Sequence, residues 1–149
     1  LGDRDIYQAI GFEKFKNLCM VGYFGSLADR LESKGVKVKA FDLDEYNKPV
    51  EPLRNQKQEL MAADAVILTA TSISNLTFAN LISFIPQNAK VFLLGPSTPL
   101  STLLFNFPNI AGMFGAKFEP YDHKVLDAIE QGGGTRSFLA RMKKVFVLR

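Results

Sequence analysis

Short apolar runs alternate with segments of helical periodicity along the chain of 149 residues. The runs have the length and continuity expected of strands that are buried on both faces. Parallel neighbours in a sheet need long crossover connections, and those connections are usually helical. The alternation therefore predicts an α/β fold with a mostly parallel sheet between two layers of helices. The expected strands lie within residues 18–24, 36–44, 65–70, 90–97, 109–118 and 143–149.

The segments between the runs supply the expected helices and loops. Residues 71–89 open with capping side chains and continue with apolar residues at helical spacing, so we expect one helix that stops near Pro86. In doubly wound, Rossmann-like sheets, ligands bind beyond the carboxyl ends of the strands, where the strand order reverses. The loops after the strands are therefore the places to look for a site. The other expected helices lie within residues 26–35, 56–64, 98–108 and 120–134.

Length and composition predict one folded domain. Hydrophobic residues make up 47% and charged residues 22% of the chain, which is typical of globular proteins. We expect a single domain over residues 1–149, with an N-terminal extension (residues 1–17) before a core (residues 18–149). The net charge of +3 is modest, and the late basic residues lack interleaved aromatic residues. A solvated face is therefore favoured over a nucleic-acid surface.

The cysteine content and the N-terminus indicate a compartment. One cysteine, Cys19, allows no internal disulfide, fits a reducing environment and is expected to be a buried structural thiol. The first residues carry acids where a signal peptide needs bases, and no apolar run approaches the ~18 residues of a membrane span. We expect a cytoplasmic protein without a membrane partner. Because residue 1 is Leu, the chain is trimmed, a fragment, or started at an unusual codon; the sequence does not choose among these.

A glycine turn follows the first expected strand. Gly22 and Gly25 in "VGYFGSL" place backbone N–H groups and a helix N-terminus where they could face an anion. The dinucleotide fingerprint G-x-G-x-x-G is incomplete, and Tyr23 stands where the backbone must approach a pyrophosphate. A nicotinamide dinucleotide is therefore not the expected cofactor. A purely structural turn and a site for another ligand both stay open.

Acidic residues follow the second expected strand. Asp42 lies twenty residues after Gly22, where nucleotide-binding folds place the carboxylate that holds a ribose. Asp42, Asp44 and Glu45 could equally hold a hard cation, or be solvated in the loop.

Polar groups also follow the third and fourth expected strands. Capping explains one or two of the hydroxyl and amide side chains after the third strand, but more are present than caps require. The turn at residues 94–99 could present Ser97 and Thr98 toward the same crevice. Four strand ends thus carry small or polar groups, and this convergence predicts a ligand site. The polar residues after the third strand are Thr69, Thr71, Ser72, Ser74, Asn75 and Thr77.

The sequence gives little support for the common catalytic motifs. His123 is the one histidine, at an expected helix start, and Cys19 is far from it in sequence, so no Cys-His pair or His-rich zinc site is indicated. Ser97 is not in a G-x-S-x-G elbow, which argues against a hydrolase triad. His123 therefore stays a weak metal candidate beside Asp42 and Asp44.

The ordered motifs "MVGYF", "AADAVILTATSISNLTFANLI", "VFLLGPSTPL" and "VLDAIEQGGG" resemble a family of Rossmann-like domains of unknown function that is labelled a heavy-metal chelation domain. The resemblance covers roughly residues 18–149. It implies a site built from Gly22, Asp42, Thr69, Asn75, Thr77, Gly95, Pro96 and Ser97.

Two departures from the family pattern matter. Family members commonly carry an N-terminal domain resembling the capping domain of enolases, and the segment before Cys19 is too short to include it. Ala70 also stands where a glycine is usual. A site formed between two domains would need a partner subunit or a separately encoded partner domain to complete it.

Three hypotheses follow from the sequence. The first is a domain that binds a small polar or anionic ligand, with any metal arriving as a complex, because soft metal ions prefer thiolate and imidazole ligands and the chain has one of each. The second is an enzyme with an adenosyl or dinucleotide cofactor, with Asp42 on the ribose. The third is a non-catalytic assembly subunit. A homo-oligomer and a separate partner domain both stay open.

Overall fold

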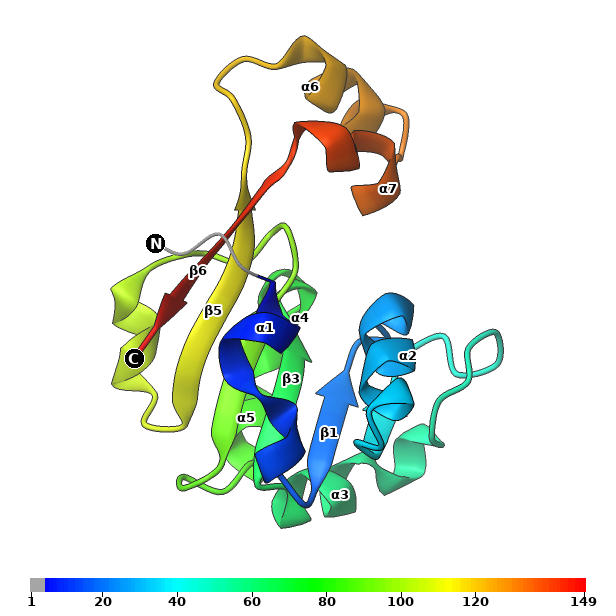
Figure 1. Cartoon of the computed structure of the whole chain (residues 1–149), viewed down its shortest axis with the longest axis vertical. Coiled ribbons are helices and arrows are strands. Elements are labelled where there is room, and N and C mark those ends of the chain that lie inside the picture. The colour runs from blue at the N-terminus through cyan, green and yellow to red at the C-terminus, as the bar shows by residue number, and fades with distance from the viewer. Residues whose placement is uncertain (1–4) are drawn as a thin grey trace.

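Six strands form one sheet in the order β2-β1-β3-β4-β5-β6 in the computed structural model, which describes residues 5–149. Neighbouring strands from β2 to β5 are parallel, and β6 pairs with β5 in the antiparallel direction. The mostly parallel, doubly wound sheet predicted from the sequence is therefore confirmed (Figure 1). The strands are β1 (Leu18–Val21), β2 (Val38–Phe41), β3 (Ala65–Thr69), β4 (Lys90–Leu94), β5 (Ile110–Lys117) and β6 (Lys143–Leu148).

The connections between strands are mostly short helices. The structure places α1 and α2 on one face of the sheet and α3 and α5 on the other. The α-helices are α1 (Ile6–Ile10), α2 (Gly25–Ser33), α3 (Gln56–Ala62), α4 (Thr71–Ser74), α5 (Phe78–Phe84), α6 (His123–Glu130) and α7 (Thr135–Phe138). Short 3-10 helices span Phe12–Lys14, Leu53–Asn55, Thr102–Asn106 and Leu139–Arg141.

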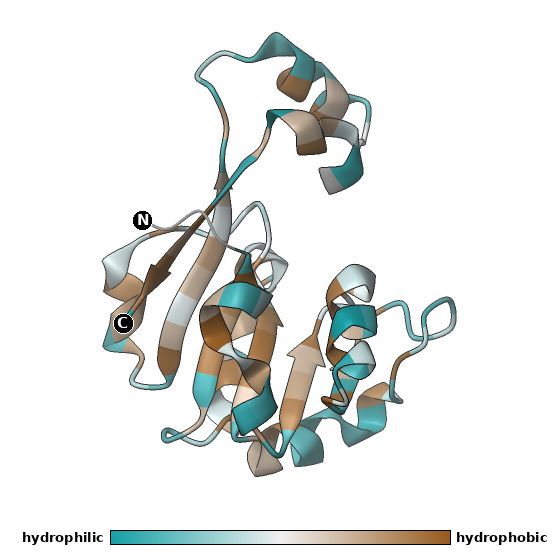
Figure 2. Cartoon of the chain, viewed as in Figure 1, coloured by the Kyte–Doolittle hydropathy of each residue, from teal (hydrophilic) through white to brown (hydrophobic). Residues whose placement is uncertain are grey.

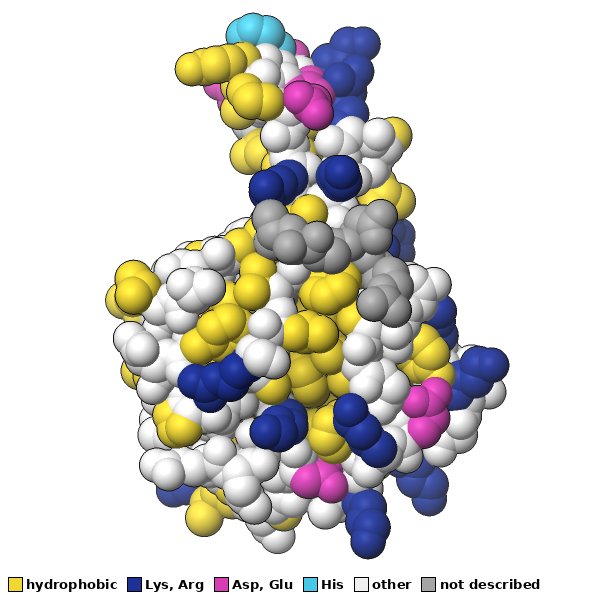
Figure 3. Space-filling model, turned by 60° about the vertical axis from the view of Figure 1, so that its left-hand side comes forward, with side chains coloured by type: hydrophobic (Ala, Val, Ile, Leu, Met, Phe, Trp, Pro, Cys, Tyr) yellow, Lys and Arg dark blue, Asp and Glu magenta, His cyan; other side chains and the backbone are white. Residues whose placement is uncertain are grey.

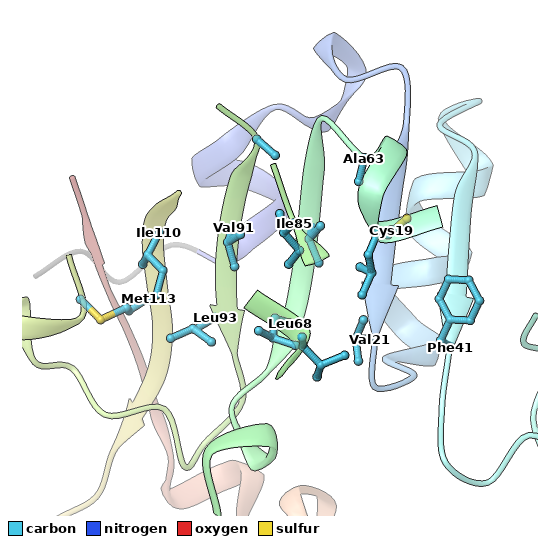
Figure 4. Packing of buried hydrophobic residues seen from close by; sticks show 14 residues of the cluster. Cys19, Val21, Phe41, Ala63, Leu68, Ile85, Val91, Leu93, Ile110 and Met113 are labelled. Atoms are coloured by element: carbon cyan, nitrogen blue, oxygen red, sulfur yellow. The ribbon is translucent and has the colours of Figure 1, made fainter. Parts of the chain in front are cut away.

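The central strands are apolar except at Thr69, which ends β3, and Lys90, which begins β4, because both faces of the sheet are covered. Successive side chains of β1 point to opposite faces, so Cys19 and Val21 join the cluster under α3 and α5. Leu18 and Met20 join the cluster under α1 and α2. Figure 4 shows the first of these clusters, and Figure 2 shows apolar residues concentrated in the sheet. None of the helices described between residues 5 and 149 is long and apolar enough to cross a membrane.

One helix prediction needs correction. The single helix expected over residues 71–89 is two helices, α4 and α5, because Leu76 adopts a left-handed backbone with φ of 63°. The Asn75 Oδ1 atom accepts hydrogen bonds from the Thr77 N–H (3.2 Å) and hydroxyl (2.7 Å), and this local competition with the helix ladder breaks the helix. The short helix expected within residues 98–108 is present as the 3-10 helix Thr102–Asn106.

The segment before β1 packs onto the sheet. Ile6 and Phe12 are buried, and the Phe12 ring meets the Phe92 ring of β4 edge-on at 5.8 Å between centroids. Asp5 caps α1 by accepting a hydrogen bond from the Gln8 N–H at 3.0 Å. Residues 5–17 therefore contribute to the core on the face that α2 also covers.

Residues 118–142, which we call the arm, join β5 to β6 and project from the sheet (Figure 1). The arm has a small core of its own, in which Val125 and Phe138 are buried and the Phe118 and Phe138 rings meet edge-on at 5.4 Å. An ion pair between Arg141 and Asp122, at 2.7 Å, ties the end of the arm to the start of α6.

Candidate ligand-binding site

The strand order reverses at β1, because β2 pairs with one edge of β1 and β3 with the other. A cavity of about 230 Å³ lies at the carboxyl ends of these three strands. We call it the switch-point cavity, and ligands of doubly wound folds bind in such positions. Five of the nine ligand-binding residues predicted from the sequence line this cavity: Gly22, Asp42, Thr69, Asn75 and Thr77.

Gly22 is required by the backbone. Its φ of +86° is unfavourable for other residues, and its N–H donates to the Phe41 carbonyl at 2.8 Å. A Cβ atom at this position would lie 2.6 Å from Cβ of Thr69, which is far inside van der Waals contact. The glycine therefore lets β1 and β3 approach each other, and the Thr69 side chain occupies the space beside the turn.

Asp42 is engaged by neighbouring residues of the turn and the following loop. Its carboxylate accepts hydrogen bonds from the backbone N–H groups of Tyr23 (2.8 Å) and Asp44 (3.0 Å), and it forms an ion pair with Lys48 at 2.8 Å. Burial favours a higher pKa for Asp42, but the hydrogen bonds from Lys48, Asp44 and Tyr23 outweigh burial and hold the pKa below its usual value. Asp42 thus clamps the glycine turn to the end of β2.

The hydroxyl groups after β3 are linked to one another and to the backbone. The Thr69 and Thr71 hydroxyls lie 2.9 Å apart, and the Ser72 hydroxyl donates to the Thr69 carbonyl at 2.7 Å. Ser74 likewise donates to the Thr71 carbonyl at 3.0 Å and does not line the cavity. Thr69, Thr71 and Asn75 line it, so they combine a local structural role with access to a ligand.

A second cavity, of about 560 Å³, lies between the sheet and the arm. We call it the arm cavity. Three further predicted residues line it: Gly25, Gly95 and Pro96. The remaining predicted residue, Ser97, is exposed and lines neither cavity. Its neighbour Thr98 is buried, where its hydroxyl bridges the carbonyls of Gly95 (2.7 Å) and Phe114 (2.8 Å).

Sequence reasoning missed several residues that line these cavities. Tyr23 and Phe24 border both, whereas the sequence indicates Tyr23 only as an obstacle to a dinucleotide. Gln56, at the start of α3, faces the switch-point cavity, and no local motif marks it. Arg136 of α7 and Lys144 of β6 line the arm cavity, and only the tertiary arrangement brings them beside residues 23–27, which follow β1.

The donor atoms of this chain do not fit direct capture of a soft metal ion. Cys19 is buried, as predicted, with its thiol 3.5 Å from the Glu59 carbonyl, and burial, with the nearby Glu59 charge, raises its pKa to about 12. His123 begins α6 on the arm, whereas Asp42 and Asp44 follow β2. Within residues 5–149, no three His, Cys, Asp or Glu side chains gather closely enough to hold a metal ion.

The fold and the position of the cavities define the class: an open, doubly wound α/β domain with a cavity where the strand order reverses. A family model described as "Putative heavy-metal chelation" matches residues 5–148, and the chain therefore belongs to this family, DUF364. The family resemblance inferred from the motifs is confirmed to that extent. A comparison with curated proteins found no match.

Two solved structures of DUF364 proteins with unknown function share the fold. One, from Desulfitobacterium hafniense DCB-2, has a TM-score of 0.78 and 22% identity, with 100% of this chain and 58% of that chain covered. The other, from Pyrococcus horikoshii, has a TM-score of 0.81 and 18% identity, with 99% of this chain and 60% of that chain covered. This chain therefore spans less than two thirds of the length of either neighbour.

Proposed function

We propose that this domain binds a small polar or anionic ligand in the switch-point cavity, and that any metal ion it handles arrives as a complex with such a ligand. The observation that carries the proposal is the convergence of Thr69, Asn75 and Gln56 on one cavity at the reversal of strand order. Hydroxyl and amide groups donate and accept hydrogen bonds without bringing a charge of their own. They suit oxygen-rich ligands, including the outer oxygens of a chelated metal.

The volume of the cavity limits the ligand. Cavities for drug-sized ligands and cofactors enclose about 300–1,000 Å³, whereas the switch-point cavity encloses about 230 Å³. A small organic acid, a polyol or the polar end of a larger molecule would fit this space. A complete dinucleotide would not.

The structure favours this reading over an enzyme that uses an adenosyl or dinucleotide cofactor. Such a cofactor would need the Asp42 carboxylate for its ribose, but two backbone N–H groups and Lys48 already engage it. It would also need room at Gly22, where the Thr69 side chain lies. Binding through the uncharged polar groups requires neither rearrangement.

A thermal-shift experiment on metal-stripped protein tests the proposal. The panels are divalent metal ions alone, citrate and other small organic acids, the same acids with metal, and S-adenosylmethionine with nicotinamide dinucleotides. A specific ligand at ~100 times its dissociation constant stabilises by ~2.7 kcal/mol, which is several degrees for a domain of this size. We expect organic acids or their metal complexes to raise the melting temperature more than metal ions or nucleotides do.

A matched pair of variants tests whether the ligand binds in the switch-point cavity. Thr69→Val removes a cavity hydroxyl and keeps the side-chain shape, while Thr102→Val makes the same change on an exposed 3-10 helix outside the cavity. Loss of one hydrogen bond should weaken binding by about two- to tenfold in the first variant and leave it unchanged in the second. Equal binding by both variants, or a response to nucleotides alone, would contradict the proposal.

A further inference from the structure

We infer that the arm cavity is a second binding site, for an organic anion with an apolar body, and that Arg136 and Lys144 recognise its acidic group. The inference concerns a different cavity from the one in the proposed function and does not depend on that function. It rests on the size of the cavity, on the chemistry of its walls and on the charges at its rim.

Apolar side chains from both the sheet and the arm form the walls. Leu94 at the end of β4 and Phe114 of β5 line the cavity on the side of the sheet, and Phe24 lines it beside α2. Leu139 and Met142 line it on the side of the arm. A volume of about 560 Å³ lies within the range of cavities that enclose whole small molecules. Such walls favour an apolar body over a bare inorganic ion.

The charges at the rim are predominantly positive. Arg136 and Lys144 line the cavity, and within residues 5–149 neither forms an ion pair. The carboxylate that lines it, Asp5, is bound by Arg30 at 2.8 Å and also caps α1. Figure 3 shows Lys and Arg side chains along the arm and its neck, above apolar side chains of the core. Lys144 also acts electrostatically on Asp5, so an anionic group meets two cations there and one carboxylate that Arg30 already pairs.

The position of the two cations selects an amphipathic anion. Arg136 comes from α7 of the arm and Lys144 from β6, where it pairs with Ala116 of β5, so the two cations approach the cavity from the arm and from the edge of the sheet. A ligand with its carboxylate or phosphate between Arg136 and Lys144 can bury its apolar part against Phe114 and Leu94. Arg suits both acidic groups because its guanidinium can donate two parallel hydrogen bonds. Free metal cations, in contrast, would be repelled by this rim.

Two fluorescent dyes test the inference. 8-Anilinonaphthalene-1-sulfonate carries an aromatic body and one negative charge, and N-phenyl-1-naphthylamine is a neutral dye of similar body. The chain has no Trp, so tryptophan emission does not interfere with either signal. We expect the natively folded protein to bind the anionic dye with one saturable site, and more tightly than the neutral dye.

Matched charge variants test whether Arg136 and Lys144 bind the acidic group of the dye. Lys144→Gln and Lys143→Gln make the same change at adjacent residues of β6, but Lys143 does not line the arm cavity. Loss of a charged hydrogen-bond partner should weaken binding of the anionic dye by about tenfold in Lys144→Gln and in Arg136→Gln. Binding of the neutral dye should be unchanged in both, and Lys143→Gln should bind both dyes as the unchanged protein does.

A cavity-filling variant tests whether both dyes bind inside the arm cavity. Ala116 lines the arm cavity from β5, and Ala116→Leu should weaken both dyes while the far-UV circular dichroism spectrum stays the same. Competition with octanoate and with octyl phosphate then separates a carboxylate ligand from a phosphate ligand. Equal effects of Lys144→Gln and Lys143→Gln would overturn the inference. Undiminished dye binding by Ala116→Leu would overturn it as well.

Discussion

Gly22 illustrates how one residue can be essential without touching a ligand. A glycine after the first strand of a doubly wound fold indicates close approach to a phosphate, yet here the close approach is to the Thr69 side chain. The positive φ of Gly22 and the hydrogen bond from its N–H to Phe41 hold the ends of β1 and β2 in place. The turn therefore shapes the switch-point cavity through the backbone.

Replacing Gly22 by Ala should destabilise the fold more than the same change at Gly35. Both glycines have positive φ, but a Cβ at Gly35 meets nothing within 4 Å, whereas one at Gly22 meets Thr69. We expect a loss of about 1–2 kcal/mol for Gly35→Ala and about 2–4 kcal/mol for Gly22→Ala. Urea unfolding measures both free energies, and equal losses would show that the contact with Thr69 is relieved without cost.

Asp42 should make the stability of the protein depend on acid pH. Its folded-state pKa is lowered, so the unfolded chain takes up the proton first. The stabilisation from this group is therefore complete above the ordinary value of about 3.9 and is lost as the pH falls through the folded-state pKa. Near neutral pH, Asp42→Asn should cost about 1–3 kcal/mol of unfolding free energy, and this difference should shrink progressively below about pH 5.

Urea unfolding at a series of pH values measures the difference between the unchanged protein and Asp42→Asn. Lys48→Met serves as the comparison, because it removes the ion-pair partner and keeps the carboxylate. The acid dependence should be weaker in Lys48→Met than in the unchanged protein. A difference between Asp42→Asn and the unchanged protein that stays constant from neutral to acid pH would show that Asp42 titrates alike in both states.

At the scale of elements, the sequence predicted the strands well because their apolar character follows from burial on both faces. Residues 65–70 and 90–97 were recognised in this way, and β3 and β4 lie within them. The break between α4 and α5 was missed, since the side chain of Asn75 competes locally with a helix that its apolar neighbours favour.

The cavities were predicted only in part. The residues at the strand ends were found because topology alone brings parallel strand ends to one edge of the sheet. Gln56 and Lys144 were not predicted as lining residues. Each lies on an element whose position beside the cavity is set by tertiary packing. The interactions of Asp42 were missed for the same reason. Its carboxylate is evident in the sequence, but its hydrogen bond from the Tyr23 N–H and its ion pair with Lys48 depend on the fold.

The arm should behave as an element with its own local stability. Its small core is built around Phe138, which is 7% exposed, while the neighbouring Leu139 is 53% exposed. Phe138→Ala should raise hydrogen exchange in residues 118–142 at least about tenfold, because truncating a buried Phe costs several kcal/mol. Exchange in β1, β3 and β4 should not change, and Leu139→Ala should affect the arm much less. Equal acceleration across the sheet would show that arm and sheet open together.

At the scale of the whole molecule, the arm is an insertion into an antiparallel pair. β5 and β6 pair from Gly112 opposite Leu148 to Lys117 opposite Lys143, and the Phe114 and Phe146 rings stack at 5.3 Å. Antiparallel strands need only a two-residue turn to connect them, for which Asn-Gly is well suited. The sheet and the switch-point cavity, whose lining comes entirely from residues 21–81, therefore do not depend on the arm.

Replacing residues 118–142 by Asn-Gly should leave a folded domain that keeps the switch-point cavity and loses the arm cavity. Far-UV circular dichroism should retain its α/β form and urea unfolding should stay cooperative, because both core clusters lie outside the arm. Ligands of the switch-point cavity should bind as before. The anionic dye should bind at least about tenfold more weakly, since Arg136, Leu139 and Met142 are removed together. An unfolded product would instead make the arm part of the cooperative folding unit, and undiminished dye binding would place the dye elsewhere on the sheet.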